Sequence, residues 1–509
     1  MKMKRALSLI CLICLLFVSV TNAQAAEIVS SKDTVVIANI LDVGSIDPTN
    51  NVSDAGTRVR QWIFEPLLHL SLSSQQYENV LAESYEYEDD KHVTFHLRKG
   101  VTFHNGNPFT ADDVLFSWQY YIEKGSYTPA CIRDNIDLEN CKIIDDYTIT
   151  LATFKPDAIL LQYLGDVNYG FIFDKETMEA GGNMAENPVG TGPYMFADYI
   201  VGDSVTLKAN ENYWGEKPYI ENVIFRVIPE MTQRGIELET GGVDVATNLD
   251  VSEIEYLRDD PAYTVIEEPG VQVHNLFYNL AEGHPLSNPD LRKAVAYAIN
   301  ENALVAGGFG GAAVPASGVS SSNALGFLKF DDWYNYNVEA AKEHLAKAGY
   351  AEGELTLTMI CDDDANRVGM CEVIMNNLNA IGINVNLVSS DFAGTVATAT
   401  DPSHEGWDLF MLKNSKASAV MQLDWAYRNS NQFVAWDDPT FNELWDKAAQ
   451  ATDPELQLQN GNELQEYFYD QMPYYPMVVQ IFYMAATSEL ENVESYDLMN
   501  ARVPVLYFK

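Results

Sequence analysis

The chain has 509 residues, with 31 Lys and Arg against 73 Asp and Glu, and a formal net charge of −42. This length is too great for one compact core and predicts two or three domains, and the hydrophobic content of 47% is that of a folded globular protein. So acidic a chain repels nucleic acid and anionic lipid, which excludes both as expected partners. The same acidity keeps a protein soluble and monomeric, whatever it binds.

The first 25 residues have the pattern of a secretory signal. A basic start precedes an apolar stretch from residue 6 to 20, and Ala23-Gln24-Ala25 fits a cleavage site. The apolar stretch is too short to span a membrane. Neither Cys11 nor Cys14 follows the small residue expected at a lipoprotein attachment site. We therefore expect residues 1–25 to be removed and a soluble protein to be released outside the cytoplasm, into the periplasm.

The first half of the mature chain is predicted to mix strands with short helices. Thr110 is a good helix N-cap, with Asp113 three residues on, and Gly190, Gly192 and Pro193 form a stiff turn that no helix crosses. Alternating and β-branched runs predict the strands. The expected strands span 34–41, 93–97, 147–151, 194–199, 204–209, 223–228 and 243–246, and the expected helices span 55–68, 112–124, 157–164 and 233–239.

The second half alternates strands with longer helices, which predicts an α/β fold with right-handed crossovers. The strand of residues 273–279 ends in polar residues, and the segment 472–481 is apolar and aromatic. The expected strands here are 273–279, 355–360, 383–388 and 408–412, and the expected helices are 288–299, 338–348, 368–381, 440–449 and 454–471.

Three ordered motifs carry a resemblance to a known family. The first is NPVGTGPY (187–194), followed by NENYWGEKPYIENVIFRVIP (210–229) and GGVDVA (241–246); the others are RKGVTFHNGNPFTADDVLFSW (98–118) and residues 285–321. Together they closely resemble the family-5 extracellular solute-binding proteins, the peptide- and nickel-type receptors of ABC importers. The motif residues themselves look like scaffolding, and we predict no ligand contact for GTGPY or YWG.

The resemblance implies an α/β, two-lobed periplasmic-binding-protein fold with hinge crossings and an extra inserted subdomain in the first lobe. We expect the crossings near Val273–Asn279 and Gln480–Ala486, because two crossing strands are what a hinge needs. The expected domains are 26–70, 187–274 and 484–509 for the core of lobe I, 71–186 for its insertion, and 275–483 for lobe II. The implied function is that of an extracytoplasmic substrate-binding protein, a monomer that captures a solute between its lobes and delivers it to the permease subunits.

No catalytic or cofactor motif stands out from the sequence. The chain contains no GxxxxGK[ST], HExxH or GxSxG, and Gly308–Ala313, which fits GxGxxA, follows a helix where a dinucleotide site would precede one. We therefore expect no enzyme activity, cofactor or metal. The alternatives are a secreted cleft enzyme such as a peptidase on the same scaffold, or a receptor for nickel or another small solute; incubation with peptides would reveal cleavage products.

Four cysteines remain after the signal, in two pairs that each enclose nine residues. In an oxidising compartment this spacing favours two local disulfides, Cys131–Cys141 and Cys361–Cys371. A metal site would need CxxC spacing or nearby histidines, and neither accompanies these cysteines.

The resemblance also suggests where the solute is bound. Dipeptide-type members carry an Asp for the peptide ammonium just after the strand matching 408–412, and an Arg for the carboxylate just past the strand matching 355–360. This sequence has Lys413 and Lys416 at the first place and Cys361-Asp362 at the second, so we predict that it does not prefer ordinary dipeptides and binds an oligopeptide. The predicted ligand-binding residues are Tyr278, Asn279, Lys413, Lys416, Asp424, Trp425 and Tyr427.

Overall fold

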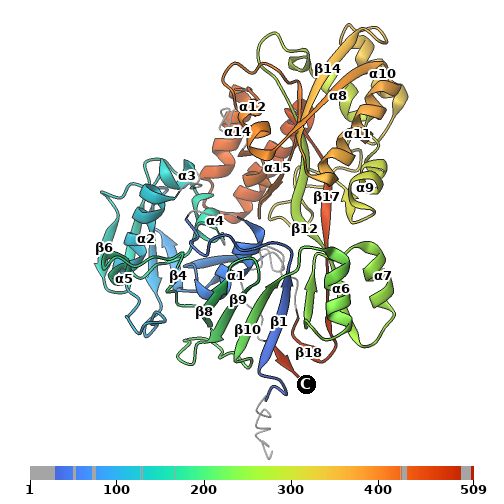
Figure 1. The fold of residues 1–509 in the computed structure, drawn as a ribbon. Coiled ribbons are helices and arrows are strands. Elements are labelled where there is room, and N and C mark those ends of the chain that lie inside the picture. Colours follow the sequence, from blue (N-terminus) through green and yellow to red (C-terminus); the bar gives the residue numbers. More distant parts are fainter. Residues whose placement is uncertain are drawn as a thin grey trace, which may run out of the picture.

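The computed structural model describes residues 29–49, 53–71, 76–125, 128, 130–166, 168–424, 426, 433–493 and 506–509. The ribbon forms two bodies, one above the other (Figure 1). We call residues 29–262 with the C-terminal strands the lower body, and residues 279–473 the upper body. The strands β12 (Tyr263–Tyr278) and β17 (Tyr474–Thr487) run from one body to the other.

The lower body is built on one half of an eleven-stranded sheet, in the order β17-β11-β1-β10-β9-β8. The central strands β11, β1 and β10 are parallel, and β9 and β8 continue the sheet antiparallel at the edge. The strands are β1 (Thr34–Asn39), β8 (Tyr194–Ile200), β9 (Ser204–Ala209), β10 (Asn222–Val227) and β11 (Val245–Thr247), with helices α1 (Asp54–Ile63), α6 (Met231–Glu239) and α7 (Val251–Arg258) and the short terminal strands β18 (Leu490–Glu491) and β19 (Tyr507–Phe508).

The upper body holds the other half of the sheet, in the order β15-β14-β16-β12, where β14 is parallel to both of its neighbours. Its strands are β13 (Ala313–Pro315), β14 (Leu355–Asp362), β15 (Ile383–Ser390) and β16 (Leu409–Ser415). Its helices are η1 (Pro285–Ser287), α8 (Pro289–Ala298), α9 (Glu301–Phe309), α10 (Val338–Lys347), α11 (Ala365–Ala380), α12 (Phe392–Ala399), α13 (Ala419–Gln422), α14 (Pro439–Gln450) and α15 (Pro454–Gln471).

The two crossings are longer than the sequence suggests, and they pair with each other. β12 and β17 are antiparallel from Tyr263 opposite Thr487 to Phe277 opposite Tyr474, with irregular register after Pro269. The predicted crossing begins at Val273, whereas β12 begins at Tyr263 and continues through two glutamates and Pro269, which are poor strand formers. Pairing along the partner strand outweighs that local preference.

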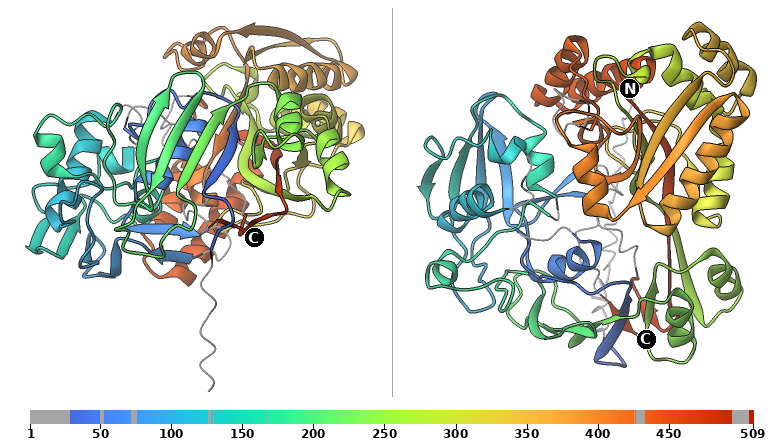
Figure 2. Two further views of the ribbon diagram at one scale, coloured as in Figure 1. Left: turned by 60° about the horizontal axis from the view of Figure 1, so that its bottom comes forward. Right: turned by 45° about the horizontal axis from the view of Figure 1, so that its top comes forward.

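The lower body also contains a separate four-stranded sheet, β4-β5-β7-β6, which stands beside the half-sheet that includes β1 (Figures 1 and 2). The helix α2 follows the predicted capping box, in which Asp113 Oδ2 accepts from the backbone N–H of Thr110 at 2.8 Å. This region also meets the upper body, since Ala158 N–H donates to the carbonyl of Ala449 at 2.6 Å. Its elements are β2 (Leu68–Ser71), β3 (Gln76–Asn79), β4 (Ala82–Tyr87), β5 (His92–Leu97), β6 (Lys142–Asp145), β7 (Thr148–Ala152), α2 (Ala111–Lys124), α3 (Ala130–Arg133), α4 (Leu160–Leu164) and α5 (Lys175–Glu179).

The turn around Gly190 and Gly192 packs directly on the end of α1. A Cβ atom at Gly190 would lie 2.0 Å from the carbonyl oxygen of Ile63, and one at Gly192 would lie 2.7 Å from the same oxygen. Helix α1 ends at Ile63, five residues before the predicted end at Leu68, because Phe64 is extended and Pro66 follows. Glycine is therefore needed at both positions, because a side chain at either one would collide with the backbone at the end of α1.

Glu65 ties the aromatic motif residues to the same turn. Its carboxylate accepts hydrogen bonds from Thr191 Oγ1 at 2.8 Å, from the Tyr213 hydroxyl at 2.7 Å and from Trp214 Nε1 at 2.9 Å. Burial raises the pKa of Glu65 to about 7, although the three donors favour its ionised form. The motif residues of the resemblance thus build the scaffold of the lower body.

The motif of residues 98–118 contains His104, which the fold holds in its neutral form beside the turn of Gly190 and Gly192. His104 Nδ1 accepts from Gly190 N–H at 3.3 Å and Nε2 donates to the carbonyl of Gly192 at 3.0 Å. Burial lowers the pKa of His104 to about 4. Below pH 6.5 the unfolded chain binds a proton that the folded chain refuses, so stability falls as the pH drops from about 6.5 to about 4, by at most about 1.4 kcal/mol per pH unit.

We expect His104→Gln to flatten this acid-side loss of stability. The measurement is the free energy of unfolding in denaturant at several pH values between 4 and 7 for both proteins. Because Gln does not titrate, the variant should lose less stability across that window, even where it is less stable at pH 7. An equal loss in the two proteins would contradict the assignment.

Candidate ligand-binding site

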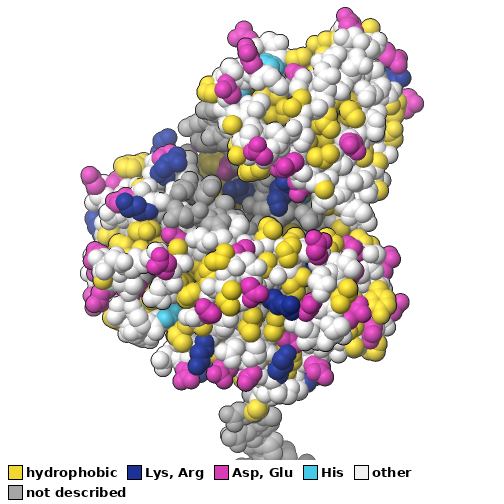
Figure 3. All heavy atoms as spheres, viewed as in Figure 1, with side chains coloured by type: hydrophobic (Ala, Val, Ile, Leu, Met, Phe, Trp, Pro, Cys, Tyr) yellow, Lys and Arg dark blue, Asp and Glu magenta, His cyan; other side chains and the backbone are white. Residues whose placement is uncertain are grey.

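The carboxyl ends of the parallel strands in both bodies point toward the junction between them. β11 is antiparallel to β17 and therefore parallel to β12, which runs from the lower to the upper body. β16 is antiparallel to β12, so β14, β15 and β16 run downward. In open α/β sheets, ligands bind outside the carboxyl ends of the strands. Figure 3 shows a hollow between the two bodies, with Lys and Arg side chains beside it.

Two of the predicted residues, Lys416 and Asp424, meet a side chain of the lower body at this junction. The Tyr163 hydroxyl, from α4, donates to Asp424 Oδ2 at 2.7 Å. Lys416 Nζ lies 5.3 Å from the centre of the Tyr163 ring, which is a cation–π contact. These three side chains therefore link the upper body to the lower one.

Buried charges balance one another in this cluster. Burial raises the pKa of Asp424, and the charge of Lys416 opposes that rise. Burial alone would lower the pKa of Lys416, but Asp424, Tyr169 and Asp166 outweigh it and the pKa is raised. One ammonium thus faces two carboxylates, so Lys416 is not a free cation for an anionic ligand group.

The other predicted lysine lies in a second, more basic cluster at the end of β14. Lys413 Nζ donates to Gln272 Oε1 at 3.0 Å, and Arg367 Nε lies 2.6 Å from Asp362 Oδ1. Burial, followed by the charges of Lys413 and Arg367, lowers the pKa of His274 to about 3. Arg367 is not among the residues predicted from the sequence; it lies in the first turn of α11, after the N-cap Asp364, and contacts Asp362 at the strand end.

The other predicted residues are not part of these clusters. Tyr278 is fully buried and pairs with Leu409, whereas Lys413 pairs with His274, four residues or about 13 Å away along β12. Asn279 Nδ2 donates to the carbonyls of His404 at 2.7 Å and Trp407 at 2.9 Å. Both residues belong to the core of the upper body. The part of β12 that faces the junction between the bodies is the middle of the strand, whereas Tyr278 is its last residue and Asn279 follows it. Trp425 and Tyr427 lie outside the described residues.

The family model of the bacterial extracellular solute-binding proteins, family 5 (middle region), matches residues 76–445. This chain belongs to that family. Its members are extracytoplasmic binding proteins that work with ABC permeases, which confirms the predicted class of function.

Individual relatives agree with the family assignment. The solute-binding protein described here is 30% identical to heme-binding protein A of Haemophilus influenzae over 360 residues, 65% of each chain. It is 26% identical to the dipeptide-binding protein of Escherichia coli over 450 residues, 81% of this chain and 82% of the other. A crystal structure of the dipeptide binding protein from Pseudoalteromonas sp. SM9913 in complex with Met-Leu superposes with a TM-score of 0.76 at 21% identity, covering 94% of this chain and 100% of that one. The predicted two-lobed α/β fold is confirmed.

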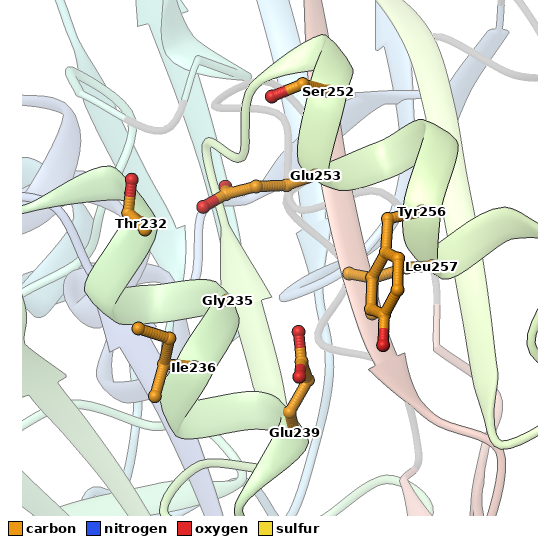
Figure 4. Close-up of a pocket in the computed structure, with 8 residues that line it drawn as sticks. All are labelled: Thr232, Gly235, Ile236, Glu239, Ser252, Glu253, Tyr256 and Leu257. Carbon is orange, nitrogen blue, oxygen red and sulfur yellow. The ribbon is translucent and has the colours of Figure 1, made fainter.

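A pocket of this solute-binding protein lies between α6 and α7 (Figure 4). Its volume is about 190 Å³, below the roughly 300–1,000 Å³ of sites that enclose small-molecule ligands. Its residues are Thr232, Gly235, Ile236, Glu239, Ser252, Glu253, Tyr256 and Leu257. Its size therefore argues against this pocket as the solute site.

The described residues lack two kinds of feature. They contain no group of three or more His, Cys, Asp or Glu side chains placed to hold a metal ion. Within the same ranges, every helix is too short or too polar to cross a membrane.

The four cysteines are free thiols in the structure, and they differ in their surroundings. Cys361, at the end of β14, and Cys371, in α11, are fully buried and their thiols are hydrogen-bonded to each other. Cys141 Sγ instead accepts from Ala152 N–H at 3.3 Å, and the thiol of Cys131 lies near Asp157. Both disulfides remain predictions, with direct contact supporting Cys361–Cys371.

We expect the protein secreted into an oxidising compartment to contain a Cys361–Cys371 disulfide. Closing so short a loop restricts the unfolded chain and should stabilise the fold by about 2–3 kcal/mol. Peptide mapping without reductant would show one linked peptide pair, and a Cys361→Ala, Cys371→Ala double variant would unfold at lower denaturant concentration. Two alkylatable thiols at these positions in the secreted protein would refute the pairing.

Proposed function

We propose that this solute-binding protein captures oligopeptides between its two bodies and delivers them to an ABC permease. The Tyr163–Asp424–Lys416 cluster carries the proposal, because it joins the bodies at the strand ends and, together with Asp166, sets two carboxylates against one ammonium group. A buried cluster with two carboxylates and one ammonium group favours a ligand that brings its own ammonium group, as a peptide does. The dipeptide-binding relatives make this ligand class a reasonable one for the chain.

Short zwitterionic dipeptides are a poorer match than longer peptides. A dipeptide needs a carboxylate and a cation that are both available within its own short length. Here Lys416 already faces two carboxylates, and Arg367 lies 2.6 Å from Asp362. Because a buried charge without its partner costs several kcal/mol, the carboxylate of a dipeptide would be poorly compensated. In a longer peptide the carboxyl terminus can reach solvent.

Several further features belong to the same proposal. The mature protein would be a periplasmic monomer, released after removal of residues 1–25, and it would have no catalytic activity of its own. A peptidase on the same scaffold is the main rival, and mass spectrometry of peptides after incubation with the protein tests it directly. Intact peptides support a binding protein, and cleavage products support the rival.

Calorimetry tests the proposed ligand class. We expect micromolar or tighter binding of tetra-alanine, weaker binding of Ala-Ala, and no binding of nickel chloride or hemin. Closure of the bodies should reduce the radius of gyration in small-angle scattering when tetra-alanine saturates the protein. Tighter binding of Ala-Ala than of tetra-alanine would overturn the preference for length, and binding of nickel or hemin alone would overturn the peptide class.

A further inference from the structure

The pocket between α6 and α7 combines acidic and apolar side chains at the surface of the lower body (Figure 4). Glu239 comes from α6 and Glu253 from α7, and the apolar part of the lining is Ile236, Tyr256 and Leu257. Ile236 is 46% exposed and Tyr256 is 65% exposed, so two large apolar side chains are open to solvent here. Apolar side chains that gather around a surface cavity indicate a site of interaction.

The carboxylate of Glu253 is turned toward α6. A Cβ atom at Gly235 would lie 3.2 Å from Glu253 Oε1, and within the described residues Glu253 Oε2 is buried and has no hydrogen-bond partner. Burial raises the pKa of Glu253, the charges of Asp250 and Glu239 raise it further, and the charge of Arg234 opposes the rise. Because buried polar atoms are nearly always paired, we expect an incoming donor to complete this pocket.

The segment that forms the pocket is more acidic than the chain as a whole. Residues 230–260 contain nine Asp and Glu and two basic residues, Arg234 and Arg258, against 73 and 31 in the full sequence. Arg234 is fully buried and donates to four backbone carbonyls, and Arg258 Nη2 lies 2.6 Å from Glu267 Oε2. General solubility does not require this local excess of carboxylates, so the excess favours a basic partner.

The size of the pocket fits a single side chain. Its volume of about 190 Å³ is too small to enclose a whole small-molecule ligand. An arginine matches the lining, because its guanidinium pairs with carboxylates through a fork of N–H donors and its flat face stacks on an aromatic ring such as that of Tyr256. Arginines are also among the side chains that contribute most to binding at protein interfaces.

The pocket lies on the flank of the hinge, beside both bodies. α6 begins four residues after the end of β10, and α7 begins four residues after the end of β11, so both helices start at the edge of the lower body that faces the junction. A Cβ atom at Gly311, just after α9, would lie 3.7 Å from Val251 Cγ2 at the start of α7. Figure 1 shows α9 of the upper body above α6 and α7. A protein seated on α6 and α7 would therefore also meet the upper body and respond to closure.

We propose that the pocket between α6 and α7 is a docking point for the ABC permease and receives an arginine side chain from an extracytoplasmic loop of the permease. The members of this family work with such permeases, and a partner placed beside the hinge can recognise the closed form. The guanidinium would pair with Glu239 and Glu253 and stack on Tyr256. This inference rests on the delivery step of the proposed function and adds the surface at which delivery takes place.

Photo-crosslinking in growing cells that produce the protein tests the partner. Tyr256 is replaced by p-benzoylphenylalanine, and the protein joined to it by irradiation is identified by mass spectrometry. We expect a membrane subunit of an ABC importer, joined through a segment that contains an arginine. Phe154, which is 57% exposed on the inserted subdomain, is the matched control position and should give no such product.

Charge variants test the chemistry of the pocket. Glu239→Lys, alone and combined with Glu253→Gln, should lower the yield of the crosslink from position 256 about tenfold or more, because the guanidinium loses its carboxylates. The Kd for tetra-alanine should stay within about twofold of the wild-type value, because the pocket is outside the Tyr163–Asp424–Lys416 cluster. Glu211→Lys reverses another exposed carboxylate of the lower body and should change neither quantity. Circular dichroism checks that each variant is folded.

Each result decides for or against the docking pocket. An importer subunit crosslinked from position 256 and lost in the charge variants supports it. No product, a product with a second copy of this chain or with a protein other than an importer subunit, or an unchanged yield in the folded charge variants would overturn it. Calorimetry with tetra-alanine tests the peptide class separately, so either proposal can fail while the other stands.

Discussion

Asp424→Asn is expected to weaken tetra-alanine binding at least thirtyfold. Removing one partner of a buried charged cluster costs roughly 2–5 kcal/mol, and the neutral amide also loses attraction for the ligand's ammonium group. Lys416 would keep Asp166 as a counter-charge, so the variant should still fold. Calorimetry gives the affinity, and thermal unfolding without ligand separates lost binding from lost stability.

Two further variants show whether the effect is specific. Tyr163→Phe removes the 2.7 Å hydrogen bond to Asp424 across the junction and should weaken binding by a smaller factor, about three- to tenfold. Asp331→Asn changes a carboxylate whose side chain is 95% exposed in the upper body and should have no effect. Unchanged affinity in a folded Asp424→Asn protein would place the ligand's amino terminus elsewhere.

The fold was predictable from sequence where local chemistry and tertiary structure agree. The capping residue Thr110 starts α2 at Ala111, and the turn signal between Ile200 and Ser204 separates two strands as expected. The fold was not predictable where pairing with a neighbouring strand outweighs the low strand propensity of the residues themselves. The segment before Val273 contains two glutamates, a proline and a glycine, yet it continues β12 because β17 supplies the hydrogen bonds.

The candidate site was likewise predictable from the sequence only in part. The loop with Lys416 and the later Asp424 were identified from their place after a strand, and the structure brings them together with Tyr163. Tyr163 could not be paired with them from sequence, because 261 positions separate it from Asp424. Tyr278 lies away from these side chains for a geometric reason: the antiparallel register carries the end of β12 away from the carboxyl end of β16.

Gly190→Ala is expected to destabilise the protein by more than about 4 kcal/mol, enough to prevent accumulation of folded protein at 37 °C. The added Cβ would lie 2.0 Å from the Ile63 carbonyl oxygen. The same oxygen accepts a hydrogen bond from Gly192 N–H at 2.9 Å. Neither segment can move without breaking this contact, because Glu65 holds the same turn through Thr191.

Gly202→Ala provides the contrast, since it tests backbone strain without a clash. Gly202 has φ of +76° and no atom within 4 Å of an added Cβ. Only the left-handed conformation opposes this substitution, so the expected cost is about 1 kcal/mol. Denaturant unfolding of the secreted proteins measures both. A Gly190→Ala protein as stable as Gly202→Ala would mean that the turn can retreat from α1, and the scaffold role of this motif would have to be abandoned.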